Sequence, residues 1–165
     1  MIRIAARILF PANAPFICIP YAGYTQHMKK TEDPLLSRAI DALQRGDFET
    51  SFVLTEALAI DGDPLAQHFL GWHYHKGLGI TVDDGKAVFW WQLAAVSGIP
   101  EAQQGLGWAY ENGRGIDRDV EQAYIWYARA VAAGDQTAQE SLTELARNMT
   151  AEQIKHLELH SHTTP

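Results

Sequence analysis

Apolar side chains in the middle of the chain recur with the spacing of α-helices. Counting from Ala87, apolar residues stand at offsets 0, 3, 4, 7 and 8, which place them on one face of a helix. Upstream, Ala66, Leu70 and Tyr74 lie four residues apart and indicate a preceding helix. Two consecutive helices are therefore expected between residues 64 and 98.

This two-helix pattern is present twice. When residues 64–99 are set over 100–135, a shift of 36, 15 of the 36 positions are identical. Average residue usage would give about two or three identities by chance. A tandem repeat of this period predicts a solenoid, in which helix pairs bury their apolar faces by stacking on their neighbours.

Glycines and aspartates stand where such helices would end and begin. Gly77 and Gly113 follow the last apolar position of the first helix by three residues, where a left-handed residue commonly ends a helix. Asp83 and Asp119 precede the second helix, where the helix dipole favours an acid. We expect a turn over 77–83 and over 113–119.

The repeat also carries a recognisable signature. Its pattern, A-x3-LG-x2-Y-x2-G-x-GI-x2-D-x3-A-x2-W(W/Y)-x2-A-x3-G, resembles the Sel-one-like repeat, a branch of the tetratricopeptide-like α/α solenoids. The resemblance covers 64–135 well and extends more loosely on both sides. It implies an all-α, right-handed superhelix of about eight helices that acts as an adaptor for other proteins and not as an enzyme.

The flanking segments predict incomplete units. Residues 34–62 align as a degenerate first unit in which Ser51 and Thr55 replace an alanine and an aromatic residue. Residues 136–160 begin like another first helix and then lose the signature. Thr150 and Gln153 have the spacing of a capping box, so a last helix should bring apolar side chains onto the end of the stack. The expected repeat domain is 34–160, with a tail at 161–165.

Residues 1–33 lie outside the repeat and are expected to be poorly structured. Two arginines precede an apolar stretch at 8–23, the charge order of a secretory signal, but Pro11, Pro15 and Pro20 break the helix that a signal usually forms. The alternative to a signal is that translation begins at Met28. A cytoplasmic location is favoured, and a periplasmic or secreted one follows if residues 1–27 act as a signal.

Composition narrows the class of partner. The formal net charge is −7, and nucleic acids and anionic membranes attract basic surfaces. No apolar run approaches the roughly 18 residues of a membrane span. The single cysteine, Cys18, has no partner for a disulfide within the chain. We expect a protein or peptide partner and a monomer or weak self-association.

Candidate chemistry is sparse. The GLG and GRG sequences at 77–79 and 113–115 lack the lysine of a phosphate-binding P-loop and fit turns better. His156, His160 and His162 could share a helix face but have no matching acid or cysteine spacing for a metal. No nucleophile stands in a catalytic arrangement, so no cofactor, metal or catalytic residue is predicted.

The predicted binding surface lies on the first helix of each unit. If these helices line the concave side of the solenoid, six side chains reach it in two equivalent sets: His68, Trp72 and His75, then Gln104, Trp108 and Glu111. Tryptophan is a preferred anchor at protein interfaces. The alternative is that Trp72 and Trp108 pack between helices. Four aromatic residues of the second helices are expected in the core: Trp90, Trp91, Trp126 and Tyr127.

The function expected from these patterns is a scaffold that holds a protein or peptide on the concave face. One alternative is a module or hydrolase that binds a small ligand, such as a sugar or a peptidoglycan fragment, through aromatic and histidine side chains. Another is a self-associating unit or part of a longer array, because two full repeats make a short groove.

Overall fold

The computed structural model describes residues 33–161, except for the side chains of 159–161. All regular secondary structure within these residues is α-helical. The chain divides into two compact units, Met1–Glu32 and Asp33–Pro165, and the described residues belong to the second. The expectations for the N-terminal segment, Cys18, His160 and His162 lie outside what is described. The described helices are α2 (Pro34–Gln44), α3 (Phe48–Ile60), α4 (Pro64–Lys76), α5 (Asp84–Val96), α6 (Pro100–Asn112), α7 (Val120–Ala132), α8 (Gln136–Ala146) and α9 (Ala151–Ser161).

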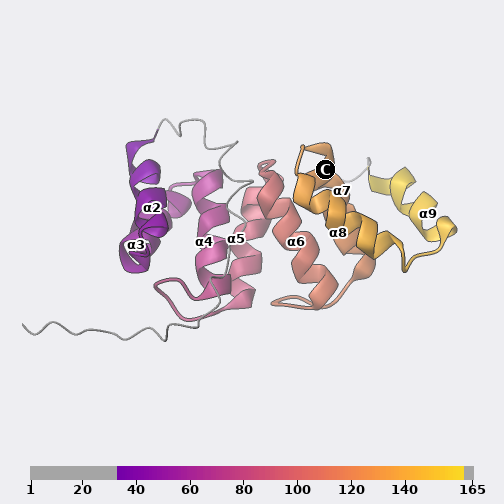
Figure 1. Cartoon of the computed structure of the whole chain (residues 1–165), viewed down its shortest axis with the longest axis horizontal. Helices are drawn as coiled ribbons and strands as arrows, with labels where there is room; N and C mark the ends of the chain where they lie inside the picture. The colour runs from indigo at the N-terminus through magenta and orange to yellow at the C-terminus, as the bar shows by residue number, and fades with distance from the viewer. Residues whose placement is uncertain (1–32, 162–165) are drawn as a thin grey trace, which may run out of the picture. The chain divides into compact units, whose positions relative to one another are not determined.

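The helices stack in chain order (Figure 1). From α2 to α7 each helix packs against the one that follows it, and α7 packs against both α8 and α9. Contacts of this kind, between near neighbours in sequence, define a solenoid. The expected all-α repeat fold is confirmed, with eight helices in the described part of the chain.

Capping residues begin and end the helices where the sequence predicts. The Asp83 carboxylate accepts a hydrogen bond from the Lys86 amide at 3.0 Å at the start of α5, and Asp119 caps α7 in the same way. Gly77 and Gly113 end α4 and α6 with φ of 68° and 63°. These are left-handed conformations that glycine adopts at little cost.

Close helix contact within each unit depends on a small residue facing a large ring. A Cβ on Gly107 would come within 2.6 Å of the Tyr127 ring, and Gly71 faces Trp91 in the same way. Trp91 and Tyr127 are buried, as predicted.

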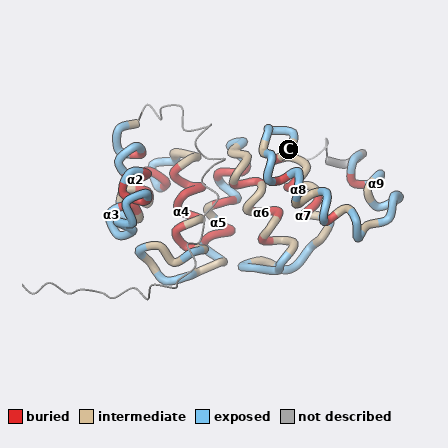
Figure 2. The backbone as a smooth tube through the Cα atoms, viewed as in Figure 1, coloured by how far each residue is buried: buried red, intermediate tan, exposed pale blue. Residues whose placement is uncertain are grey.

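Two of the four aromatic residues expected in the core lie at its edge. Trp90 and Trp126 are only half-buried. They stand one position before Trp91 and Tyr127, so the helix turns them away from the preceding helix. The guanidinium of Arg129 covers one face of Trp126, 4.8 Å from the ring centroid. Figure 2 shows that the buried positions of α4 and α6 alternate mostly with intermediate ones, and those of α5 and α7 with intermediate and exposed ones.

Successive units are joined by a repeated hydrogen bond. The Gln67 amide donates to the Ala59 carbonyl at 3.3 Å, and Gln103 donates to the Ala95 carbonyl at 3.1 Å. Donors and acceptors are each 36 positions apart, so the bond is the same element of two consecutive units.

A buried polar pair, Ser51 of the first unit and His73 of the second, stands where the units that follow carry alanines. The His73 Nδ1–H donates to the Leu78 carbonyl at 2.6 Å, so in the neutral ring Nε2 is free to accept the Ser51 hydroxyl proton at 3.0 Å. Both side chains are buried. Their counterparts 36 residues further along are Ala87 of α5 and Ala109 of α6, both fully buried. The contact between α3 and α4 therefore keeps the packing of the contact between α5 and α6 and adds hydrogen bonds to it.

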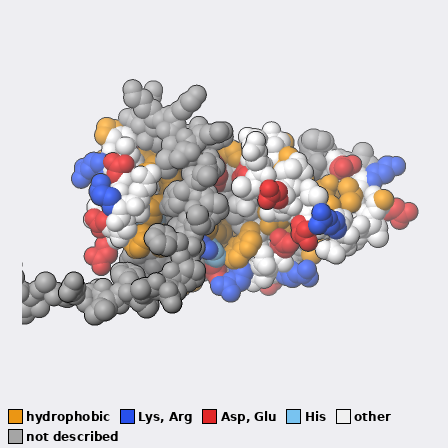
Figure 3. All heavy atoms as spheres, viewed as in Figure 1, with side chains coloured by type: hydrophobic (Ala, Val, Ile, Leu, Met, Phe, Trp, Pro, Cys, Tyr) orange, Lys and Arg blue, Asp and Glu red, His pale blue; other side chains and the backbone are white. Residues whose placement is uncertain are grey.

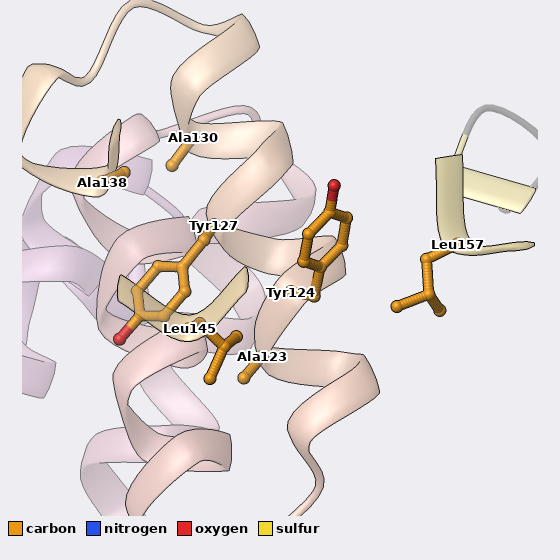
Figure 4. Packing of buried hydrophobic residues seen from close by; sticks show 7 residues of the cluster. All are labelled: Ala123, Tyr124, Tyr127, Ala130, Ala138, Leu145 and Leu157. Atoms are coloured by element: carbon orange, nitrogen blue, oxygen red, sulfur yellow. The ribbon is translucent and has the colours of Figure 1, made fainter. Parts of the chain in front are cut away.

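The C-terminal helix covers the end of the stack. The predicted capping box is confirmed, because the Gln153 amide donates to the Thr150 hydroxyl and the Gln153 side chain accepts from the Thr150 amide. Leu157 of α9 is buried in a cluster with Tyr124 of α7 and Leu145 of α8. Figure 4 shows Leu157 directed toward the Tyr124 ring across the gap between the two helices. This contact brings α9 onto α7, as the sequence indicates.

Candidate functional site

The first helices α4 and α6 present side chains at matching positions. Trp72 and His75 lie on α4, and Gln104, Trp108 and Glu111 lie on α6. All five are half-buried, so each presents some surface to solvent. We refer to these five residues as the aromatic wall. Its assignment to a concave side of the solenoid stays a prediction.

His75 connects the two tryptophans of the aromatic wall. The Trp72 and His75 rings stack with centroids 5.5 Å apart and planes 4° apart. Trp108 meets the same imidazole edge-on, with centroids 4.6 Å apart. Aromatic pairs favour these two arrangements because the ring face is negative and the edge positive. The contact links α4 to α6 and fixes the distance between the two indoles.

Trp91 of α5 packs against the buried side of the aromatic wall. Its ring lies 5.6 Å from His75 and 6.4 Å from Trp72, measured between centroids. Trp91 is 3% exposed and is held between two glycines, Gly71 of α4 and Gly105 of α6. A Cβ on Gly105 would lie 3.1 Å from the indole. The absence of side chains at both glycines is what lets the indole reach the wall.

An ion-pair network holds His75 in place. The His75 Nδ1–H donates to Asp84 Oδ1 at 2.8 Å, and the Arg114 guanidinium approaches Asp84 Oδ2 at 2.7 Å. Burial alone would raise the pKa of Asp84, but hydrogen bonds from His75 and Arg114 hold it below its usual value. Burial lowers the pKa of His75, opposed by the hydrogen bond to Asp84. The imidazole is therefore neutral near neutral pH, with Nδ1 protonated by assignment from its acceptor.

At the other end of the wall, Glu111 accepts a hydrogen bond from the buried Tyr127 hydroxyl at 2.8 Å. Burial, followed by the bond to Glu111, raises the pKa of Tyr127. Arg118 donates to the Glu111 backbone carbonyl at 2.9 Å. The Glu111 carboxylate is thus oriented by the second helix of its own unit.

His68 is placed differently from the expectation. It stands one helical turn before Trp72 but is only 3% exposed. Burial lowers its pKa to about 4, and the nearby charge of Asp135 opposes that shift. We therefore leave His68 out of the surface offered to a partner and treat it as a core residue.

Sequence reasoning missed four contributors to the wall: Lys76, Asp84, Trp91 and Arg114. Lys76 carries its ammonium 4.9 Å above the Trp72 ring. Asp84 and Arg114 differ from their counterparts in the other unit, Val120 and Leu78. These differences between the repeats were the sequence signal that could have identified Asp84 and Arg114. A position that varies between otherwise matching units is not required for the packing that the units share.

The described residues offer little else that could carry chemistry. They contain no group of three or more histidine, cysteine or acidic side chains placed to hold a metal ion. Among these residues, no helix is long and apolar enough to cross a membrane. Figure 3 shows acidic and basic side chains interspersed over the described part of the face drawn.

Comparisons with known proteins identify the family to which the two repeats are similar. Residues 64–98 and 100–135 each match the family model of the Sel1 repeat. A Sel1 repeat protein from Oxalobacter formigenes is similar over 67% of this chain and 46% of its own, with 28% identity and a TM-score of 0.64. The protective antigen c5321 of uropathogenic Escherichia coli, which displays an SLR fold, is similar over 77% of this chain and 28% of its own, with 26% identity and a TM-score of 0.72.

The chain therefore spans less than half the length of either of these two proteins. No curated protein matches it at a significant level. Sel1 repeats are typically protein–protein interaction modules, and the fold is generally a scaffold without enzymatic activity. The resemblance predicted from the sequence is confirmed: residues 64–98 and 100–135 are Sel1 repeats, and the described helices form the Sel1-repeat fold.

Proposed function

We propose that this chain is an interaction module that binds a peptide or protein segment across the aromatic wall, with Trp72 and Trp108 as anchors. The observation that carries the proposal is the stack in which His75 spaces these two partly exposed indoles. Tryptophan side chains are enriched among the few residues that dominate binding energy.

Packed and hydrogen-bonded residues lie behind the aromatic wall. Trp91, held between Gly71 and Gly105, prevents the wall from collapsing inward. Asp84 and Arg114 fix the imidazole that spaces the tryptophans. A surface organised before binding loses less conformational entropy when a partner docks, and this raises affinity.

Glu111 and Lys76 give the wall polar ends of opposite sign. Glu111 lies one turn after Trp108, and the Lys76 ammonium lies over Trp72. An extended peptide that crosses the wall would place apolar side chains on the indoles and a charge at each end. Charges at the rim of an interface set its orientation more than its affinity.

We expect Trp108→Ala to weaken peptide binding by about 30-fold or more, the loss typical of a central anchor. The test is to select peptides on the full chain from a displayed library and to measure their affinity by fluorescence anisotropy for the wild type, Trp72→Ala and Trp108→Ala. Helicity by circular dichroism should be retained.

Trp126→Ala is the matched control. It also removes a half-buried indole, but from α7 and away from the wall. The proposal fails if Trp126→Ala weakens binding as much as the wall variants, or if neither wall variant weakens it. Thermal stabilisation by a muropeptide, lost in the wall variants, would instead favour the small-ligand alternative.

A further inference from the structure

The second helices α3 and α5 expose apolar side chains in a regular stripe. On α3 these are Val53, Ala57 and Ile60, with Val53 62% and Ile60 69% exposed. On α5 they are Phe89, Leu93 and Val96, with exposures of 52%, 40% and 84%. Offsets of four and seven put each set on one helix face. We call these six residues the outer stripe; contiguous exposed apolar surface of this kind marks interaction sites.

The two halves of the outer stripe are the same positions of consecutive units. Val53, Ala57 and Ile60 precede Phe89, Leu93 and Val96 by 36 residues each. Both helices also pack on α4, one from each side along the chain. Because α3 and α5 are equivalent elements of a repeat, they run in the same direction and present their stripes on the same side of the solenoid.

The stripe ends at the third unit. The equivalent positions on α7 are Ile125, which is half-buried, Arg129 and Ala132. Arg129 directs its guanidinium over the Trp126 ring. A charged residue therefore stands where Leu93 stands in the unit before, so the apolar surface covers two helices and has no third row.

We propose that the outer stripe binds a second copy of this chain, related by a twofold axis that runs parallel to α3 and α5 between them. Such an axis places α3 of one copy against α5 of the other, side by side and in the same direction. Homodimers most often have this isologous form, in which one patch contacts itself.

Side-chain sizes fit this pairing. The axis brings repeat-equivalent positions of the two copies opposite one another, so Ala57 faces Leu93 of the second copy. Val53 faces Phe89 in the same way. Each pair sets a smaller residue against a larger one, which lets the two faces interdigitate at the density of a protein interior.

Charges at one end of the stripe are also complementary. Glu49 lies four residues before Val53 and Lys86 three before Phe89, so each flanks its stripe on the same helix face. Glu49 is exposed; the Lys86 side chain is 60% exposed, and its ammonium lies 3.8 Å from Asp83 Oδ2 and 5.1 Å from the Tyr74 ring centroid, contacts that it would share with Glu49 in the dimer. In the proposed dimer Glu49 of one copy meets Lys86 of the other, and this occurs twice. Parallel contact of like helices, α3 with α3, would instead bring two glutamates together.

The first test is the mass of the full chain by light scattering after size exclusion, over a range of concentrations. We expect the wild type to reach twice the mass of the chain, and Val96→Glu to remain at the mass of one chain with unchanged helicity. Val82→Glu is the control, since Val82 is 58% exposed but lies outside the outer stripe. The proposal is overturned if the wild type stays monomeric throughout, or if Val96→Glu and Val82→Glu behave alike.

The second test addresses the axis. With Cys18 replaced by serine throughout, chains carrying Ala57→Cys and chains carrying Leu93→Cys are mixed and oxidised. A disulfide should form between the two kinds of chain and not within either kind alone. Cross-linking of Ala57→Cys to itself would overturn the proposed symmetry. Because the outer stripe shares no residue with the aromatic wall, either proposal can fail without the other.

Discussion

Replacing Gly115 with alanine should lower the free energy of unfolding by about 3 kcal/mol, the combined cost of a left-handed backbone and of overpacking. Gly115 has a φ of 73°, and a Cβ there would overlap the Asp84 carbonyl group and lie 2.8 Å from the Gly85 amide nitrogen. The obstacle is backbone at the first turn of α5, which no rotamer change can remove. The turn between α6 and α7 would have to separate from the unit before it.

Gly98→Ala is the control that separates the cost of the left-handed backbone from the cost of the clash with the neighbouring unit. Gly98 has a φ of 86°, but nothing lies within 4 Å of the Cβ it would gain. It should therefore cost only the backbone term, about 1–2 kcal/mol. Urea unfolding followed by circular dichroism at 222 nm gives both values. Equal losses for the two variants would mean that the turn does not rest on α5.

The contrast between these glycines marks what sequence reasoning could and could not reach. Both recur at the repeat period, Gly98 as Gly134 and Gly115 as Gly79, so the requirement for glycine at each position is visible in the sequence. Each unit also approaches the backbone of the unit before it, Gly115 at Asp84 and Gly79 at Phe48. Predicting these close approaches requires the relative placement of successive units. The pattern of residues within one unit carries no information about the angle at which the next unit packs against it.

The same limit explains the outcome at the candidate site. Helical periodicity places His68, Trp72 and His75 on one face, but it does not say how far the neighbouring helices cover that face. The structure buries His68 and leaves the other two partly open.

Trp91 illustrates a signal that was available but needed the correct comparison. It is a large residue between Gly71 and Gly105, and Gly105 replaces Phe69 of the preceding unit. The residue at the position of Trp91 in the first unit is the smaller Thr55. A large ring on one second helix thus accompanies a small residue on the next first helix. This exchange of size between units could be found by comparing helices across the unit boundary.

The histidines of α4 should make the fold sensitive to acid. Burial lowers the pKa of His68 from 6.5 to about 4, and burial also lowers the pKa of His73 below 6.5. The unfolded chain therefore binds protons at a pH where the folded chain does not. The stabilising contribution is complete above pH 6.5 and is lost as the pH falls toward 4. For His68 the full loss is about 3 kcal/mol, at about 1.4 kcal/mol per pKa unit.

The measurement is the free energy of unfolding at a series of pH values between 7.5 and 4. His68→Gln introduces the residue found 36 positions further along, Gln104, and should reduce the loss of stability on acidification by up to the contribution of His68. Ser51→Ala combined with His73→Ala introduces the alanine pair found 36 positions further along, Ala87 and Ala109, and should remove the contribution of His73. His156→Gln, which changes an exposed histidine of α9, is the control. If His68→Gln and His156→Gln decline in parallel with the wild type, the acid sensitivity does not originate in the buried imidazole of α4.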